Sequence, residues 1–90
     1  MVKEKELEKG GTDELMSDER NLVLFNDDHN TFDHVIETLV KVCKHEYNQA
    51  EQCALVAHFN GKCTVKTGSF DELKPMQEAM SLQDLTVEIQ

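Results

Sequence analysis

The sequence has no tryptophan, one tyrosine and one proline, and only nine Lys or Arg stand against 18 Asp or Glu. The formal net charge of −9 argues against nucleic acid or an anionic membrane as the main partner, because both require Lys and Arg clustered on one face. Long apolar runs are also missing, and none approaches the roughly 18 residues that span a bilayer. We therefore expect a soluble protein whose partners present cationic groups.

Closely spaced cysteine pairs are absent as well. Cys43, Cys53 and Cys63 stand ten residues apart, without the C-x-x-C pair that brings two thiolates to one metal ion. Free cysteine is often buried, so we interpret all three as small apolar side chains and expect no cofactor. The charged start, Met1 to Lys5, lacks the apolar region of a secretory leader, and together with the odd cysteine count this favours a cytoplasmic location.

Ninety residues suit one small domain. The first 20 residues hold four Lys or Arg and seven Asp or Glu, with Gly10-Gly11 among them, and offer little apolar surface to offset the entropy of ordering. We predict a flexible charged extension over 1–19 and a folded domain over 20–90. The remaining residues hold five basic and 11 acidic side chains, so the folded part is itself acidic.

Apolar periodicity predicts the first three elements. A short apolar run over 22–25 ends in a turn-forming cluster over 26–30, which indicates a strand entering a loop. Apolar residues then recur at steps of three and four, which predicts a helix over about 31–45 with Asn30 as its N-cap. A second helix is expected from Asn48, where Asn-x-x-Glu repeats the capping pattern, to Gly61.

The second half of the chain predicts two strands around a third helix. Apolar and polar residues alternate over 63–67, as in a strand with one solvated face. The segment 69–72 has the pattern of a capping box, but Pro75 would lose a backbone hydrogen bond and collide with the preceding turn of a regular helix. We therefore predict a single turn at 70–73, a helix starting near Pro75, and a closing strand over 85–89.

The predicted order is β-α-α-β-α-β. Amphipathic helices and short strands with one apolar face suit an α+β fold, a two-layer sandwich of three helices on one side of a three-stranded antiparallel sheet. Once these faces fill the core, no further apolar stripe remains. We therefore expect the protein alone to be a monomer.

The unusual feature of the sequence is polar. Asn26, Asp27 and Asp28 follow the first strand and precede a helix, where their side chains can project together into a shallow cleft. His58 falls in the last turn of the second helix, on the stripe that should face the first. Such residues also serve as turn and cap residues, or as ligands and acid–base groups of a metal-dependent enzyme that uses Asp27, Asp28 and His58. No third close metal ligand is evident from the spacing.

The residues around this cluster resemble the ClpS adaptor family over about 21–68. The resemblance lies in Leu24-Phe25-Asn26-Asp27-Asp28, then Val35, then Ala57-His58-Phe59-Asn60-Gly61-Lys62. It implies a protein that is not an enzyme and needs no cofactor. Such an adaptor binds the N-terminal residue of N-end rule substrates and passes them to a hexameric Clp unfoldase of the AAA+ class, of the ClpA or ClpC type.

The resemblance also implies roles for individual residues. Asn26, Asp27 and His58 would bind the substrate α-amino group, with Asp28 in the same motif. The residues at the positions of the hydrophobic pocket, which receives Phe, Tyr, Trp or Leu, are Asn30, Phe32, Val35, Ala54 and Ala57. Ala54 stands where bacterial relatives commonly have Met. We therefore expect a roomier pocket that also tolerates Ile.

Two features limit what the resemblance implies. The segment 69–83 matches the family poorly, so the face that docks on the unfoldase is not assigned. The expected fold also resembles the C-terminal domain of the ribosomal stalk protein, so fold alone does not identify function. A generic protein-interaction module remains the alternative, although it would not need Asn26, Asp27 and His58 to converge.

Overall fold

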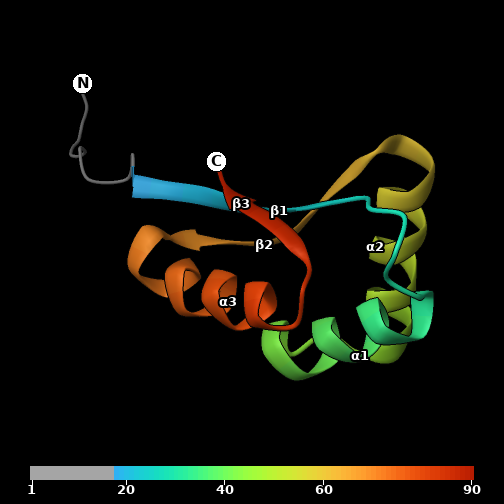
Figure 1. Cartoon of the computed structure of the whole chain (residues 1–90). Helices are drawn as coiled ribbons and strands as arrows, with labels where there is room; N and C mark the ends of the chain where they lie inside the picture. The colour runs from blue at the N-terminus through green and yellow to red at the C-terminus, as the bar shows by residue number, and fades with distance from the viewer. Residues whose placement is uncertain (1–17) are drawn as a thin grey trace.

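The computed structural model describes residues 18–90, so the predicted extension over 1–19 lies almost wholly outside the described residues. The elements are β1 (Glu19–Phe25), α1 (Phe32–Cys43), α2 (Tyr47–Asn60), β2 (Lys62–Ser69), α3 (Phe70–Leu82) and β3 (Thr86–Ile89). Strand β1 is central and pairs antiparallel with β2 and with β3. The helices lie on one side of this sheet (Figure 1), which confirms the predicted two-layer α+β sandwich and its element order.

The core lies between the sheet and the helices. Leu22 and Leu24 lie two residues apart on β1, so both side chains point toward the helices. They are fully buried, as are Leu39 of α1 and Met80 of α3. Each such side chain contributes roughly 1.5–3 kcal/mol by leaving water. No helix in the described range 18–90 is long and apolar enough to cross a membrane.

Helix α1 begins with Thr31 as its N-cap, not with the predicted Asn30. The Thr31 hydroxyl accepts a hydrogen bond from the His34 backbone N–H at 3.1 Å. Two hydrogen bonds that its NH2 group donates, to the Asp27 carboxylate and to the Asp84 carbonyl, orient the Asn30 side chain toward the loop and the α3–β3 turn. The competing contacts therefore move the helix start by one residue.

Helix α2 also begins earlier than predicted. Its N-cap is Glu46, whose side chain makes no capping hydrogen bond, and Asn48 lies inside the first turn. The Ala50 N–H donates to the Glu46 carbonyl at 2.9 Å, so the backbone forms this turn without a side-chain cap. The predicted end is confirmed, because Gly61 adopts a left-handed conformation with φ +94° and caps the helix.

Helix α3 runs without a break through Pro75, so the predicted single turn followed by a new helix is wrong. The predicted capping box is confirmed: the Ser69 N–H donates to the Glu72 carboxylate at 2.9 Å, and the Glu72 N–H donates to the Ser69 hydroxyl at 3.2 Å. Leu73 and Met80 are fully buried on either side of the proline. Packing on both sides outweighs the one backbone bond that proline removes.

The cysteines pack as the sequence predicts. Cys43 is buried, Cys53 and Cys63 are half-buried, and all three thiols are free. Burial raises the pKa of Cys43, and burial together with the neighbouring Cys63 and Cys43 raises the pKa of Cys53 to about 12. These two thiols therefore stay protonated near neutral pH. Within residues 18–90, no group of three or more His, Cys, Asp or Glu is arranged to hold a metal ion.

Candidate functional site

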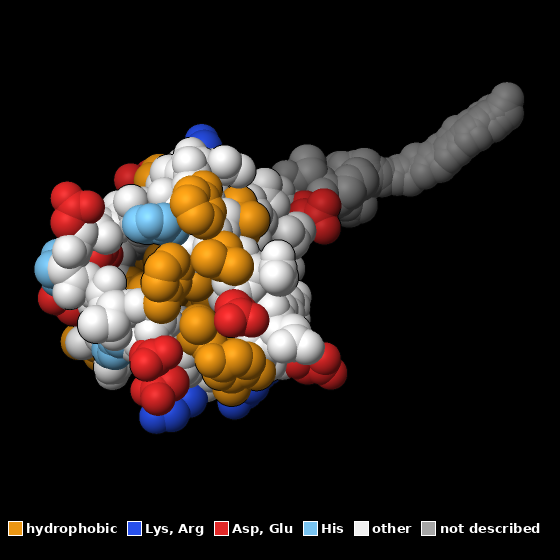
Figure 2. Space-filling view, turned by 90° about the vertical axis from the view of Figure 1, so that its right-hand side faces the viewer, with side chains coloured by type: hydrophobic (Ala, Val, Ile, Leu, Met, Phe, Trp, Pro, Cys, Tyr) orange, Lys and Arg blue, Asp and Glu red, His pale blue; other side chains and the backbone are white. Residues whose placement is uncertain are grey.

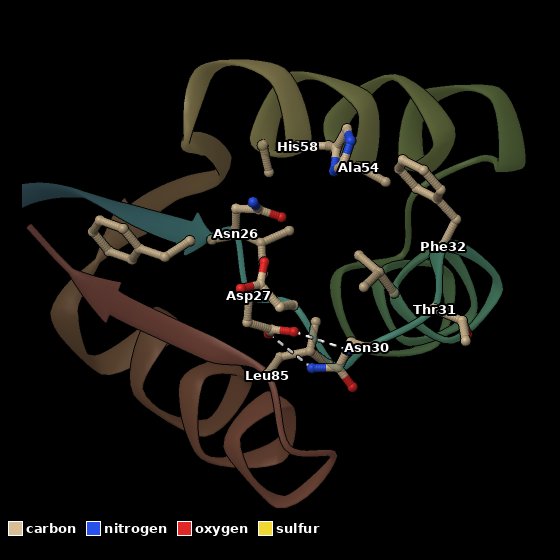
Figure 3. A pocket seen from close by; sticks show the side chains of 13 residues that line it. Asn26, Asp27, Asn30, Thr31, Phe32, Ala54, His58 and Leu85 are labelled. Carbon is tan, nitrogen blue, oxygen red and sulfur yellow. Dashed lines mark hydrogen bonds between the residues drawn. The ribbon is translucent and has the colours of Figure 1, made fainter.

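A cavity of about 280 Å³ opens where the end of β1 meets α1 and α2 (Figure 3). It is lined by Leu24, Phe25, Asn26, Asp27, Asp28, Asn30, Thr31, Phe32, Val35, Ala54, Ala57, His58 and Leu85. Every residue predicted for the site is in this set. The structure thus brings together two segments that the sequence separates by about 30 positions.

A backbone hydrogen bond joins these two segments. The Asn26 N–H, just after β1, donates to the Gly61 carbonyl at 2.9 Å. Gly61 ends α2 and turns the chain directly into β2, whose Lys62 pairs with Phe25 of β1. The last turn of α2, which carries His58, is therefore held beside the end of β1.

The Asp27 carboxylate organises the loop between β1 and α1. Its Oδ1 accepts hydrogen bonds from the backbone N–H groups of His29 at 3.2 Å and Asn30 at 2.9 Å. Its Oδ2 accepts one from the Asn30 side-chain amide at 2.8 Å. Because a carboxylate has about four acceptor positions, one position on Oδ2 is left for a ligand.

These hydrogen bonds also set the charge of Asp27. Burial by itself raises the pKa of this carboxyl group, because it disfavours the charged form. The hydrogen bonds from the Asn30 side chain and from the Asn30 and His29 backbones, together with the His29 ring, outweigh burial and hold the pKa below its usual value. Asp27 is therefore an anion at neutral pH.

The same loop is tied to the turn between α3 and β3. The Asn30 side-chain amide donates to the Asp84 carbonyl at 2.8 Å, and His29 Nε2 lies 3.2 Å from an Asp84 carboxylate oxygen. Asp84 adopts a left-handed conformation with φ 70°, and the next residue, Leu85, is buried and lines the cavity. Leu85 thus adds to the apolar side of the cavity a residue that neither α1 nor α2 supplies.

The apolar part of the cavity depends on small side chains. Ala54 and Ala57 of α2 are 4% and 3% exposed, and they face Phe32 and Val35 of α1 across the space between the helices. A larger residue at either alanine would narrow that space. The small side chains at both positions therefore leave room for the cavity.

His58 stands at the rim of the cavity, between two aromatic rings. Figure 3 shows its ring directed from α2 toward Phe32. The ring centroids of His58 and Phe32 are 5.2 Å apart, and those of His58 and Phe59 are 5.0 Å apart, both in edge-to-face arrangements. His58 lines the cavity, as its place on the stripe of α2 that faces α1 predicts, but its side chain is exposed to solvent.

Four lining residues were not predicted: Leu24, Phe25, Thr31 and Leu85. One signal for Leu24 was present, because side chains alternate along a strand and Leu24 shares a face with Asn26. Leu85 had no local signal, since only the contacts of Asp84 with the β1–α1 loop bring it to the cavity.

The lining has one polar side and one apolar side. At the mouth lie an amide, two carboxylates and an imidazole, from Asn26, Asp27, Asp28 and His58. Among residues 18–90, no Lys or Arg lines the cavity. Such acceptors favour a cation with several hydrogen-bond donors. The apolar side favours a hydrophobic group attached to that cation.

Comparisons with known proteins identify the family and a similar fold. A family model described as "ATP-dependent Clp protease adaptor protein ClpS" matches residues 16–87. The solved structure of Agrobacterium tumefaciens ClpS2 bound to L-phenylalaninamide is similar in fold, with a TM-score of 0.76 at 20% identity, over 81% of this chain and 95% of that one. The E3 ubiquitin-protein ligase UBR1 of Drosophila melanogaster is 33% identical over 61 residues, which are 68% of this chain and 3% of that protein.

Proposed function

The chain belongs to the ClpS family of Clp protease adaptors, and from this premise we propose that its cavity binds the free N-terminal residue of substrate proteins. The protein then delivers these substrates to a hexameric AAA+ unfoldase of the ClpA or ClpC type, in the cytoplasm and without chemistry of its own. The observation that carries the proposal is that hydrogen-bond acceptors and an apolar cavity meet at one mouth, to which no Lys or Arg of the described part of the chain contributes.

The polar residues suit an α-ammonium group. An ammonium presents three N–H donors in a tetrahedral fan and needs acceptors from different directions. The Asn26 amide oxygen, the free position on Asp27 Oδ2 and a ring nitrogen of His58 offer them from two parts of the fold. Asp28 adds negative charge at the same mouth.

The apolar residues suit one large hydrophobic side chain. A cavity of about 280 Å³ lies below the range of about 300–1,000 Å³ that is usual for drug-sized ligands. Burying Phe or Leu there contributes roughly 1.5–3 kcal/mol, and each charge-assisted hydrogen bond contributes about as much. After the loss of translational and rotational freedom, we expect dissociation constants in the micromolar range, about −8 kcal/mol.

A titration of ¹⁵N-labelled protein with L-phenylalaninamide tests the proposed site. We expect saturable shifts of the backbone resonances of Asn26, Asn30 and His58, and none beyond the noise in the middle of α3. Glycinamide, which keeps the ammonium and lacks the side chain, is the matched control and should bind at least about tenfold more weakly. Shifts centred elsewhere, or equal affinities for the two amides, would refute the proposal.

The size of the residue at position 54 is expected to set the tolerance for β-branched first residues. Ala54→Met adds three heavy atoms to a side chain that lines the cavity. Ile carries a branch at Cβ, close to the mouth, so it should lose more affinity than Leu. We expect the Ile/Leu affinity ratio to fall about fivefold or more, which corresponds to roughly 1 kcal/mol.

Fluorescence anisotropy with peptides that differ only in a first Ile or Leu measures this ratio. Gln52→Met is the control, because Gln52 is exposed on α2 and does not line the cavity. An unchanged ratio in Ala54→Met would show that position 54 does not limit the pocket.

A further inference from the structure

The outward face of α2 carries an apolar surface that the core does not use. Phe59 lies four residues after Leu55 and three after Val56, so its side chain is a neighbour of both on the helix surface. Leu55 is half-buried, Val56 is 38% exposed and Phe59 is 77% exposed. We call these three residues the α2 ridge. The expectation that no apolar stripe remains outside the core is therefore wrong. Figure 2 shows hydrophobic side chains gathered in a band over the side of the molecule that α2 forms.

The composition of α2 is unusual for an exposed helix of this chain. Charged residues make up 30% of the sequence, whereas Glu51 is the one Asp, Glu, Lys or Arg among the 14 residues of α2. Exposed apolar surface without charge marks a contact surface more often than a solvated one. The α2 ridge thus has the character of a binding surface.

The α2 ridge is continuous with the mouth of the cavity. Phe32, which lines the cavity, contacts His58 edge to face at 5.2 Å, and His58 contacts Phe59 in the same way at 5.0 Å. The three rings form a row that leads from the cavity, past the proposed ammonium site, to the α2 ridge. A chain that leaves the cavity on the α2 side meets Phe59 first.

The geometry of an extended chain indicates which substrate residue would reach Phe59. In an extended chain the side chains of residues 1 and 3 point to the same side and stand roughly 6.6 Å apart, at about 3.3 Å per residue. The aromatic row takes two steps, of 5.2 and 5.0 Å, from the Phe32 ring at the cavity to the Phe59 ring, so a side chain about 6.6 Å beyond one held in the cavity can contact Phe59. Residue 2 points away from the protein.

We propose that the α2 ridge binds the side chain of the third residue of the substrate and favours an apolar one, with Phe59 as the specificity-determining contact. The proposal rests on the proposed binding of the first residue in the cavity. A second copy of this chain is the less suitable occupant, because two chains of formal charge −9 repel each other. The uncharged substrate side chain meets no such repulsion.

Affinities of three peptides test the proposal: Phe-Ala-Leu-Ala, Phe-Ala-Gly-Ala and the isomer Phe-Leu-Gly-Ala, each with a free amine. We expect the first to bind about three- to tenfold more tightly than the second, as partial burial of one Leu allows. The isomer should bind like the second peptide. Phe59→Ala should remove the preference for Leu at residue 3, while Tyr47→Ala, an exposed aromatic at the other end of α2, should keep it.

The outcomes separate this proposal from the one on which it rests. If Phe-Ala-Gly-Ala binds and its acetylated form does not, the cavity works as proposed. In that case equal affinities for Leu and Gly at residue 3, or a Leu preference that survives in Phe59→Ala, overturn the role of the α2 ridge. Self-association of the wild type that Phe59→Ala abolishes, without any residue-3 preference, would assign the ridge to contacts between copies and also overturn it.

Discussion

A peptide that begins with Phe is expected to lose at least about 100-fold in affinity when its first amino group is acetylated, which corresponds to roughly 2.7 kcal/mol. Acetylation removes the positive charge and leaves one N–H donor in place of three. The acceptor positions that Asn26, Asp27 and His58 offer to the ligand would then lie buried without donors, and each unsatisfied position costs about 1–3 kcal/mol. Fluorescence anisotropy with a dye at the peptide's C-terminus measures both affinities.

The side chain of the peptide is the same in both forms, so the comparison isolates the amine. A Gly-Phe peptide serves as a second control, because it has a free amine but places the aromatic ring one residue later. It should bind as weakly as the acetylated peptide. Acetylated and free forms that bind within threefold of each other would mean that the cavity recognises the side chain alone.

Replacement of Asp27 is expected to have the second-largest effect, on both binding and stability. Asp27→Ala removes the acceptor of three hydrogen bonds that hold the loop between β1 and α1, and leaves the Asn30 amide with fewer partners. We expect the free energy of unfolding to fall by about 2–3 kcal/mol. Affinity for a Phe-starting peptide should fall at least about 30-fold, because the loop and its charge are both lost.

The stability effect should depend on pH in a defined direction. The folded pKa of Asp27 lies below its ordinary value, so the folded state favours the carboxylate. The contribution of the Asp27 carboxylate to the free energy of unfolding is complete above the unfolded pKa of about 4. It is lost as the pH falls through the lower pKa of the folded state. Urea unfolding between pH 7 and pH 2 should therefore show a smaller acid loss of stability in Asp27→Asn than in the wild type.

Asp28→Asn is the matched control for this series. It removes the same charge at the next position, but Asp28 is exposed and makes no hydrogen bond recorded within residues 18–90. We expect a stability change within about 0.5 kcal/mol. If Asp28→Asn and Asp27→Asn lowered stability equally, net charge and not the loop hydrogen bonds would explain the effect.

The sequence was most informative where a pattern acts locally. Local patterns predicted the order of the elements, the Ser69–Glu72 capping box and the end of α2 at Gly61, because these features depend on residues within one or two turns. It was less informative about where α1 and α2 begin. At those positions Asn30 and Asn48 have the right chemistry for a cap, but contacts with distant residues and packing moved the helix starts.

The continuity of α3 is another feature that local sequence did not predict. Pro75 predicts a break from local sterics alone, and the break does not occur. Leu73 and Met80 are buried in one core on either side of it, and the free energy of that burial exceeds the loss of one hydrogen bond. Packing of this kind cannot be predicted from residues that are adjacent in the sequence.

The sequence by itself determined the acidic character of the protein and its α+β order, and it singled out the residues of the proposed binding motif, Asn26, Asp27 and His58. Only the tertiary structure decided how these residues meet. The Asn26–Gly61 backbone bond places His58 at the end of β1, and the Asp84 contacts bring Leu85 to the cavity. The structure also showed that α2 exposes a ridge beside that cavity, because exposure depends on which faces the other elements cover. A residue's type is local, whereas its neighbours across the fold are set by the packing of the whole chain.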